Sequence, residues 1–160
     1  MRRRGLLALA ATAAALVLVG PAAASHRVPG IEKHGVAAMA RTFDWPAAGT
    51  VTTPFTSYHH GIDIGMLQSL TVIAAAGGKV ESVGYVYGFE GYGNIVAVDI
   101  APHVLALYAH LSSYSVHPGE RVRMGQVLGV AGCTGMCTGT HLHFEMRVNG
   151  VAVDPRYFLR

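Results

Sequence analysis

The sequence predicts a small all-β domain built from antiparallel strands. From about residue 43 onward, short apolar runs alternate with turn residues at intervals of about 8–12 residues, which is typical of antiparallel sheets. The segment 147–153, RVNGVAV, has an Asn-Gly pair between two apolar stretches and therefore predicts a tight hairpin. No amphipathic helix of useful length follows residue 42, so helices are not expected to contribute much to the fold.

The expected strands are short apolar stretches, and turn residues separate them. Turns are expected at Gly77-Gly78, Gly91, Pro102, Pro118-Gly119 and Asn149-Gly150. The segment 57–65 is also expected to be extended. The strand segments are 49–55, 70–76, 78–88, 92–100, 104–111, 120–132 and 141–153.

The first 24 residues are predicted to be a signal peptide. Three arginines at positions 2–4 precede an apolar run at about 5–19, and the small residues 22–24 form a cleavage site. The run is short for a membrane span, so no stable membrane insertion is expected after cleavage; an uncleaved anchor is the alternative. We therefore expect an exported, extracellular protein.

The remaining chain is expected to contain a linker and one folded domain. Residues 25–42 have little periodicity and form the linker, with a helical turn around 36–40. Residues 43–160 form the domain, which is long enough for one core of ordinary size.

The excess of basic residues lies in the predicted signal. The whole chain has 12 Lys and Arg against 9 Asp and Glu, a formal net charge of +3. Three of the basic residues are at positions 2–4, so the rest of the chain balances at nine against nine. Because the sequence shows no basic patch, we expect no binding to nucleic acid or anionic lipid.

Cys133 and Cys137 are expected to form a disulfide. They are the only two cysteines and lie four residues apart in a Gly/Thr-rich segment, and export implies an oxidising compartment. The bridge would pin the loop that precedes His141. The alternative is a pair of thiolate metal ligands.

Alternation along segment 57–65 gives one face a histidine and an acid. Side chains two residues apart share a face of an extended strand, so His59, Gly61 and Asp63 face one way and His60 faces the other. His59 and Asp63 can then converge on one point, with Gly61 leaving room between them. A hydrogen-bonded surface pair is the alternative, and His60 is expected outside the site.

A second alternating stretch adds two histidines and an acid. His141, His143 and Glu145 share one face, with Leu142 and Phe144 packed behind. The carboxylate of Glu145 is expected either to fix the tautomer of a neighbouring imidazole or to face solvent.

The two stretches together supply a ligand set that suits zinc. A catalytic zinc site has three protein ligands and one open position, and imidazole and carboxylate are among its usual ligands. His59, Asp63 and one of the two histidines at 141 and 143 would fill the three positions. The other histidine would lie beside the open position.

A third stretch, 104–111, adds another histidine. Tyr108 and His110 are expected on one face of a strand, and His110 is a further candidate for the neighbourhood of the metal. The other histidines lie in the linker or in turns and are expected to be solvated: His26, His34, His103 and His117.

These motifs together resemble the lysostaphin-type (LytM-like) zinc metallopeptidases, which cut the peptide part of bacterial peptidoglycan. The resemblance covers about residues 46–158 and implies a small antiparallel β-sheet domain with zinc at the floor of a groove. It also implies a protein associated with the cell wall. The matching segments are HHGIDIG (59–65), YAHL (108–111), VRMGQVLGVAGCTG (122–135) and TGTHLHFEMRVNGVAVDP (138–155).

The resemblance implies roles for five residues. By position, His59, Asp63 and His143 match the ligands of one Zn²⁺ per chain, and His110 and His141 match two catalytic histidines. One of these two would take the proton of the attacking water, and the other would hydrogen-bond the developing oxyanion; the sequence leaves open which does which.

Two departures from the family pattern bear on substrate binding. The segment before His59 is shorter than is usual in the family, which predicts a groove that is open at that end. No wall-targeting domain accompanies residues 43–160, so the enzyme is expected to find its polymer unaided or through a wall-targeting partner protein.

Two other functions are alternatives to zinc-dependent hydrolysis of peptidoglycan peptides. A catalytically inactive family member would bind peptidoglycan or activate another wall hydrolase; such proteins typically lose metal ligands, and here all five positions are filled. A biotinyl or lipoyl carrier domain has segments similar to 78–84 and 122–129 but needs a modifiable lysine at a hairpin tip. The chain has only Lys33, in the linker, and Lys79, at a strand start.

Overall fold

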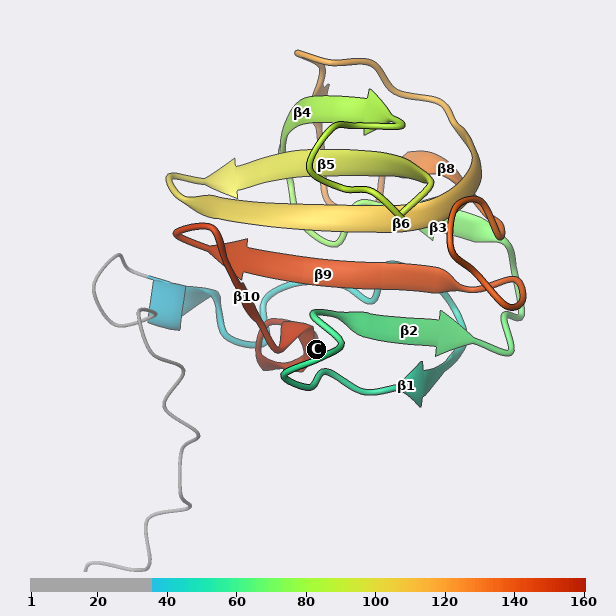
Figure 1. The fold of residues 1–160 in the computed structure, drawn as a ribbon. Helices are drawn as coiled ribbons and strands as arrows, with labels where there is room; N and C mark the ends of the chain where they lie inside the picture. The colour runs from blue at the N-terminus through green and yellow to red at the C-terminus, as the bar shows by residue number, and fades with distance from the viewer. Residues whose placement is uncertain (1–35) are drawn as a thin grey trace, which may run out of the picture.

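The computed structural model describes residues 36–160, and almost all of its regular structure is β (Figure 1). Every strand pair is antiparallel, as the sequence predicts. Two short 3₁₀-helices are the other regular elements of residues 36–160, η2 (Val36–Met39) and η3 (Pro155–Tyr157). The strands are β1 (Thr50–Thr53), β2 (Ile62–Gly65), β3 (Thr71–Ile73), β4 (Gly78–Gly84), β5 (Asn94–Ala101), β6 (Val104–Tyr114), β7 (Arg121–Val122), β8 (Val127–Ala131), β9 (Leu142–Val148) and β10 (Val151–Val153).

The strands that bear the predicted site residues are neighbours in the sheet. The main order is β1-β2-β9-β6-β5-β4-β7, with β10 beside β9 and with β8 joining β6 to β3 behind the main sheet (Figure 1). The register pairs Asp63 of β2 with His143 of β9, and Ala109 of β6 with the same histidine. Segments far apart in the sequence therefore meet around β9.

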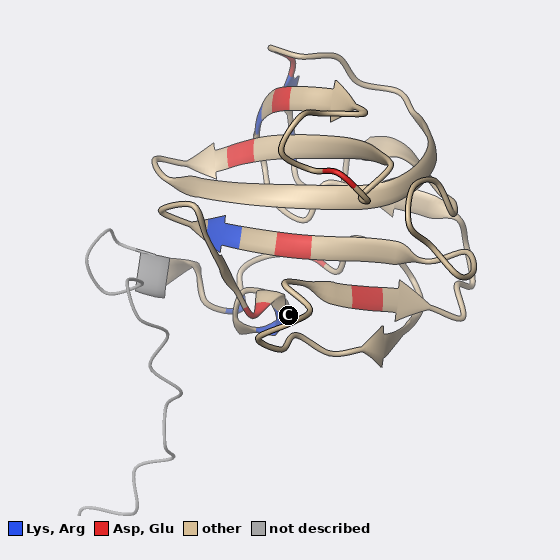
Figure 2. Cartoon of the chain, viewed as in Figure 1, with Lys and Arg blue, Asp and Glu red and all other residues tan. Residues whose placement is uncertain are grey.

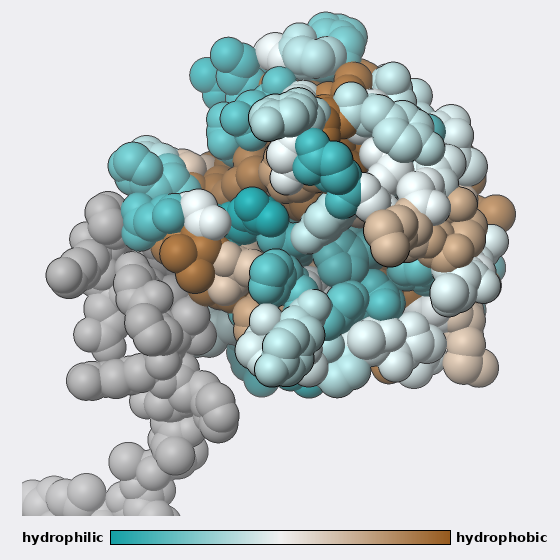
Figure 3. All heavy atoms as spheres, viewed as in Figure 1, coloured by the Kyte–Doolittle hydropathy of each residue, from teal (hydrophilic) through white to brown (hydrophobic). Residues whose placement is uncertain are grey.

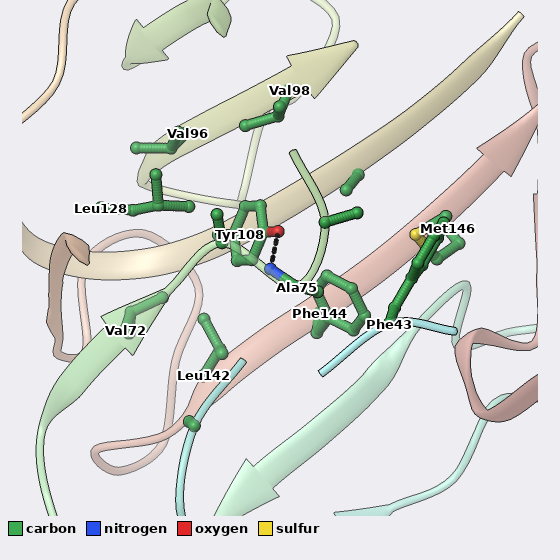
Figure 4. Close-up of a cluster of buried hydrophobic side chains, with 14 of the residues drawn as sticks. Phe43, Val72, Ala75, Val96, Val98, Tyr108, Leu128, Leu142, Phe144 and Met146 are labelled. Carbon is green, nitrogen blue, oxygen red and sulfur yellow. Dashed lines mark hydrogen bonds between the residues drawn. The ribbon is translucent and has the colours of Figure 1, made fainter. Parts of the chain in front are cut away.

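The main core lies on one face of this sheet. Alternate residues of β9, namely Leu142, Phe144 and Met146, are fully buried there, as the period-2 pattern predicts. Tyr108 of β6 packs beside Phe144, and its hydroxyl accepts a hydrogen bond from the backbone N–H of Ala75 at 2.8 Å (Figure 4). The polar tip of the buried tyrosine is therefore satisfied.

A smaller apolar cluster covers part of the opposite face. Ile95, Ala97, Leu107 and Ala109 of β5 and β6 are fully buried there, and Val86, Phe89 and Tyr92 of the β4–β5 loop pack on them. This loop crosses in front of β5 and β6 in Figure 1. The odd-numbered residues of β9, including His143 and Glu145, lie on the same face because they pair with Ala109 and Leu107.

A β-bulge in β6 contradicts the prediction that Tyr108 and His110 share a face. Between the pairs Asn94↔Leu111 and Val96↔Tyr108, β6 has one more residue than β5. His110 adopts the left-handed conformation, with φ 61°. The extra residue shifts the alternation, so Tyr108 enters the main core while His110 faces the site.

Other element boundaries also differ from the sequence prediction. Only 62–65 of the extended segment 57–65 is a strand, and the run 120–132 is divided into β7 and β8 by a turn at Gly125, with φ 79°. The hairpin predicted at Asn149-Gly150 is confirmed between β9 and β10. Both turn residues have positive φ, 53° and 77°, as a type I′ turn requires.

The predicted signal peptide, 1–24, and residues 25–35 of the predicted linker lie outside the described residues. The helical turn expected near 36–40 is present as η2. Among residues 36–160, no helix is long and apolar enough to cross a membrane.

Candidate metal centre

The predicted site residues line a groove of about 440 Å³. Its walls come from the loop before β2, the β4–β5 loop, β6 and the loop between β8 and β9. Tyr58 and Met136 are almost fully exposed at its rim, and Glu90 adds a carboxylate there. In the space-filling view, hydrophilic residues in teal gather near the centre of the face that the β4–β5 loop crosses (Figure 3).

Three of the lining residues form a compact group of potential metal ligands. His59, Asp63 and His143 each offer one ligand atom, and these atoms lie within 4.8 Å of one another. Asp63 Oδ1 is 3.1 Å from His59 Nε2 and 2.9 Å from His143 Nδ1. The structure therefore brings together the three predicted ligands, and their function as ligands remains a prediction.

The tautomer of His59 shows that this group fits a cation. A carbonyl oxygen only accepts, so His59 Nδ1 donates to the carbonyl of Pro54 at 3.0 Å. In a neutral His59 the lone pair of Nε2 then points towards Asp63 Oδ1, so that two hydrogen-bond acceptors face each other. The pair needs a positive charge between its atoms, either a proton or a metal ion. Two imidazole nitrogens and a carboxylate oxygen suit zinc in particular.

Gly61 permits the close approach of β2 and β9 beside the cluster. A Cβ at this position would lie 2.5 Å from the carbonyl oxygen of Phe144 and 2.7 Å from His143 Nε2. Both distances are far inside van der Waals contact, so no side chain fits without a shift. The sequence expectation that Gly61 leaves room between the site residues agrees with this geometry.

The rings of His110 and His141 lie together at the edge of the cluster. Their centroids are 4.8 Å apart, and His141 Nε2 is 3.6 Å from Asp63 Oδ1. His110 Nδ1 donates to the carbonyl of Thr134 at 2.8 Å, and His141 Nδ1 donates to that of Gly139 at 2.7 Å. When neutral, each ring therefore keeps its Nε2 lone pair free to accept a proton.

The electrostatics of the site combine a fixed anion with a neutral imidazole. Burial alone raises the pKa of Asp63, but hydrogen bonds from His143 and Thr53 and nearby positive charge lower it to about 2. Burial lowers the pKa of His110 from its ordinary value, more than the bond to Thr134 raises it. His110 is therefore available as a proton acceptor at neutral pH.

The loop between β8 and β9 orients both of these histidines. It contains Cys133 and Cys137, which the structure pairs in a disulfide with a Cα–Cα distance of 5.3 Å. The carbonyl of Thr134, which holds His110, lies between the two cysteines, and the carbonyl of Gly139, which holds His141, lies two residues after the bridge. The sulfurs are bonded to each other, so the alternative of two thiolate metal ligands does not agree with the structure.

The remaining histidines lie outside the ligand group. His60 is exposed and does not belong to the cluster, as expected, although it lines the same groove. His103 and His117 are exposed in turns, in agreement with the sequence prediction. His26 and His34 lie outside the described residues.

Sequence reasoning missed two residues behind His143. Tyr92 and Arg147 both hydrogen-bond Glu145, which is fully buried and does not face solvent. Arg147 is two residues after Glu145, so alternation would have indicated a shared face. Tyr92 comes from a loop 53 residues earlier, and no local pattern indicates that contact.

Comparisons with known proteins indicate a peptidase fold. The sequence model of Peptidase family M23 matches residues 57–155. "DD-carboxypeptidase/endopeptidase Mpg" of Neisseria meningitidis serogroup B is 45% identical over 97 residues, 61% of this chain and 22% of that protein. "Murein hydrolase activator NlpD" of Escherichia coli is 34% identical over 121 residues, 74% of this chain and 31% of that protein. The matched region is thus less than a third of either relative.

Two solved structures have the same fold. A zinc-containing peptidase from Vibrio cholerae is similar with a TM-score of 0.65 and 27% identity, over 73% of this chain and 40% of that one. The antimicrobial peptidase lysostaphin from Staphylococcus simulans is similar with a TM-score of 0.61 and 31% identity, over 73% of this chain and 52% of that one. The resemblance to lysostaphin that the motifs predict is therefore confirmed.

Proposed function

Because the chain belongs to peptidase family M23, we propose that it is a zinc-dependent endopeptidase that hydrolyses peptide bonds of bacterial cell-wall peptidoglycan, in cross-links or stem peptides. The observation that supports this most directly is the group of His59, Asp63 and His143 at the groove, with two further imidazoles beside it. All five positions that the family chemistry needs are filled and close together.

In this proposal His59 Nε2, Asp63 Oδ1 and His143 Nδ1 hold one zinc ion per chain. Bound zinc would supply a Lewis acid that polarises the scissile carbonyl and makes water easier to deprotonate. The chain itself orients the ligands. The carbonyl of Pro54 fixes His59, and the pairing of β2 with β9 fixes Asp63 opposite His143.

His110 and His141 handle the proton in this mechanism. Each keeps Nδ1–H on a backbone carbonyl, so its Nε2 can accept the proton of the attacking water and return it to the leaving amine. One of the two does this, and the other, when protonated, donates a hydrogen bond to the developing oxyanion. The bulge at His110 is what aims this ring into the site.

The proposed substrate is outside the cytoplasmic membrane, which agrees with the predicted signal peptide at 1–24. The N. meningitidis relative is named for carboxypeptidase and endopeptidase activity, which supports a peptide as substrate, and the name of the E. coli relative, an activator of murein hydrolase, supports a place of action at the wall. We further propose that the exported protein works in or near the wall, on its own or with a wall-targeting partner protein.

The proposal is tested by digesting purified walls of several cross-link types and identifying the released muropeptides by mass spectrometry, with bound zinc measured beside the rate. Variants of the three ligands are expected to lose zinc and activity. Variants of the two proton-handling histidines are expected to keep zinc and to lose about 10²-fold or more in rate. The variants are His59→Ala, Asp63→Ala, His143→Ala, His110→Ala and His141→Ala.

The matched control is His60→Ala, which removes a neighbouring imidazole that is exposed and outside the cluster. It is expected to keep its zinc. Zinc retained by the His59 variant and lost by the His60 variant would contradict the ligand assignment. Zinc lost from the variant of His110 or His141 would contradict the division between ligands and proton acceptors.

An inactive wall protein that activates another hydrolase is the second candidate, because one relative is named a murein hydrolase activator. The two functions differ in what the metal ligands do. An activator would increase digestion of walls by a second hydrolase, and its Asp63→Ala variant would do so equally well. A parent protein with full zinc that cleaves no wall type would favour this second function.

A further inference from the structure

His143 needs the opposite tautomer from the other three histidines of the site. His59, His110 and His141 each donate Nδ1–H to a backbone carbonyl, at 3.0, 2.8 and 2.7 Å. His143 instead turns Nδ1 towards Asp63, 2.9 Å away, and its Nε2 points away from the cluster. If Nδ1 is to bind a metal, the ring proton has to be on Nε2.

The Nε2 atom of His143 lies in a closed place. It is buried, and no hydrogen-bond partner lies within reach among residues 36–160. On one side the backbone of Gly61 leaves no room for a partner, because a Cβ added to this residue would lie only 2.7 Å from His143 Nε2. Glu145 lies behind the ring, with Oε2 3.6 Å from Nε2. A buried N–H without an acceptor is costly, so this carboxylate is the group that can satisfy it.

Glu145 is held in place by two residues that the proposed mechanism does not otherwise use. Its side chain has no exposed surface. The hydroxyl of Tyr92 donates to Oε2 at 2.8 Å, the same oxygen that faces His143, and Nε of Arg147 donates to Oε1. Figure 2 shows the one acidic residue of β9, Glu145, in red and its one basic residue, Arg147, in blue. Arg147 is fixed in turn, with its guanidinium 5.0 Å from the centre of the Phe89 ring.

A purely structural role does not explain this carboxylate. Glu145 pairs across the sheet with Leu107, whose neighbours in the small cluster are apolar. A well-packed apolar side chain would fill such a place at least as favourably, because desolvating an ion pair offsets much of its attraction. Glu145 is nevertheless ionised, buried and held by two hydrogen bonds directly behind His143. This arrangement indicates that the carboxylate acts on that predicted ligand.

We propose that Glu145 is a positioning residue of the zinc site: its carboxylate accepts the Nε2–H of His143 and so leaves Nδ1 free for the metal, while Tyr92 and Arg147 hold the carboxylate. This inference rests on the proposed function, because it concerns the same metal. It adds a reason why the β4–β5 loop has to close over this face, since Tyr92 comes from that loop.

The first test is the affinity of the full chain for zinc, measured by competition with a chelator. Glu145→Gln is expected to weaken zinc binding about 10- to 100-fold. Tyr92→Phe keeps the ring contacts with Phe89 and His143 but removes one bond to Glu145, so a smaller loss is expected. Glu81→Gln, on the exposed face of β4, is the matched control and should bind like the parent.

The second test reads the tautomer directly. Long-range ¹H–¹⁵N spectra of the zinc-loaded parent should show the proton of His143 on Nε2 and the protons of the other three histidines on Nδ1. Zinc on Nδ1 would by itself put the proton on Nε2, so the reading that is specific to Glu145 is the ¹H shift of this proton: a hydrogen bond to the carboxylate moves it downfield. The measurement needs no variant, so it decides the question even if Glu145→Gln fails to fold.

The outcomes separate this inference from the proposed function. A parent that binds no zinc would overturn the proposed function itself. A parent that binds zinc, together with unchanged affinity in the folded Glu145→Gln variant and in Tyr92→Phe, would overturn only the positioning role. An Nε2 proton of His143 without the downfield shift in the zinc-loaded parent would overturn the positioning role as well, whereas a proton on Nδ1 would overturn the assignment of His143 as a ligand.

Discussion

Gly61→Ala should damage the metal site through a single methyl group. The new Cβ would lie 2.5 Å from the carbonyl oxygen of Phe144 and 2.7 and 2.8 Å from Nε2 and Cε1 of His143, whereas ordinary contact begins at 3.4 Å. One obstacle is backbone, and the other is a ring that is fixed between Asp63 and Glu145. Neither is the free end of a flexible side chain, so β2 and β9 have to move apart where Asp63 faces His143.

The expected size of the effect follows from the required shift. Relief of these contacts needs several tenths of an ångström, and forcing extra volume into a packed site costs about 1–3 kcal/mol. Metal–ligand distances are met to within about 0.2 Å in working sites. The variant should therefore lose several degrees in the unfolding temperature of the metal-free protein and about tenfold or more in zinc affinity.

The assay compares Gly61→Ala with Gly139→Ala, by thermal unfolding in a chelator and by chelator competition for zinc. Gly139 lies beside the site, but a Cβ there would meet nothing within 4 Å, so this variant should resemble the parent. If Gly61→Ala unfolds at the same temperature as Gly139→Ala and binds zinc within twofold of it, the steric reasoning is wrong.

Three further predictions concern the same site. Reduction of the Cys133–Cys137 bridge should lower activity more than stability, because so short a loop contributes about 2 kcal/mol at most while it orients His110 and His141; two free thiols by intact mass in protein recovered outside the cell would contradict the bridge. His110→Gly should be more stable than His110→Ala by about 1 kcal/mol in chemical unfolding, since a non-glycine residue pays for the left-handed backbone there, and equal stabilities would show that the bulge is unstrained. Hydrolysis should fall below about pH 6, with zinc loss at lower pH, because protonated imidazole neither accepts a proton nor binds metal. Asp63, with a pKa of about 2, stays charged in this range. Because the pKa of His110 is lowered, His110 becomes protonated, and stops accepting a proton, only at a lower pH. A rate that stays constant down to pH 4 would contradict this assignment.

Alternation of side chains predicted most of the fold where the strands are regular. On β9 it separated Leu142 and Phe144, which enter the main core, from His143 and Glu145, which face the site. The same rule, applied to residues 57–65, brought His59 and Asp63 together, although only 62–65 became a strand. It succeeded because one buried face fixes the register of a strand.

The rule failed where backbone geometry is irregular. At His110 the left-handed residue and the extra position in β6 reverse the alternation, so Tyr108 and His110 face opposite sides. Histidine is enriched among the non-glycine residues with positive φ, but such residues are uncommon, so a histidine alone does not indicate a bulge, and the sequence contains no glycine there to signal one. Strain of this kind tends to occur at functional sites, and here it directs a predicted proton acceptor into the groove.

Predicting ligands from sequence spacing is easier than predicting what holds them, and the histidines of this site show why. The carbonyls of Pro54, Thr134 and Gly139 fix three of the rings, but backbone acceptors leave no trace in residue identity. The fourth ring, His143, faces a carboxylate, which is visible in the sequence, yet the alternatives of a buried partner and a solvent-facing acid stayed open. What separates them is the contact of Glu145 with Tyr92, which depends on how the β4–β5 loop packs on the sheet. The ligand set is thus a property of two short segments, whereas the protonation of those ligands is a property of the whole fold.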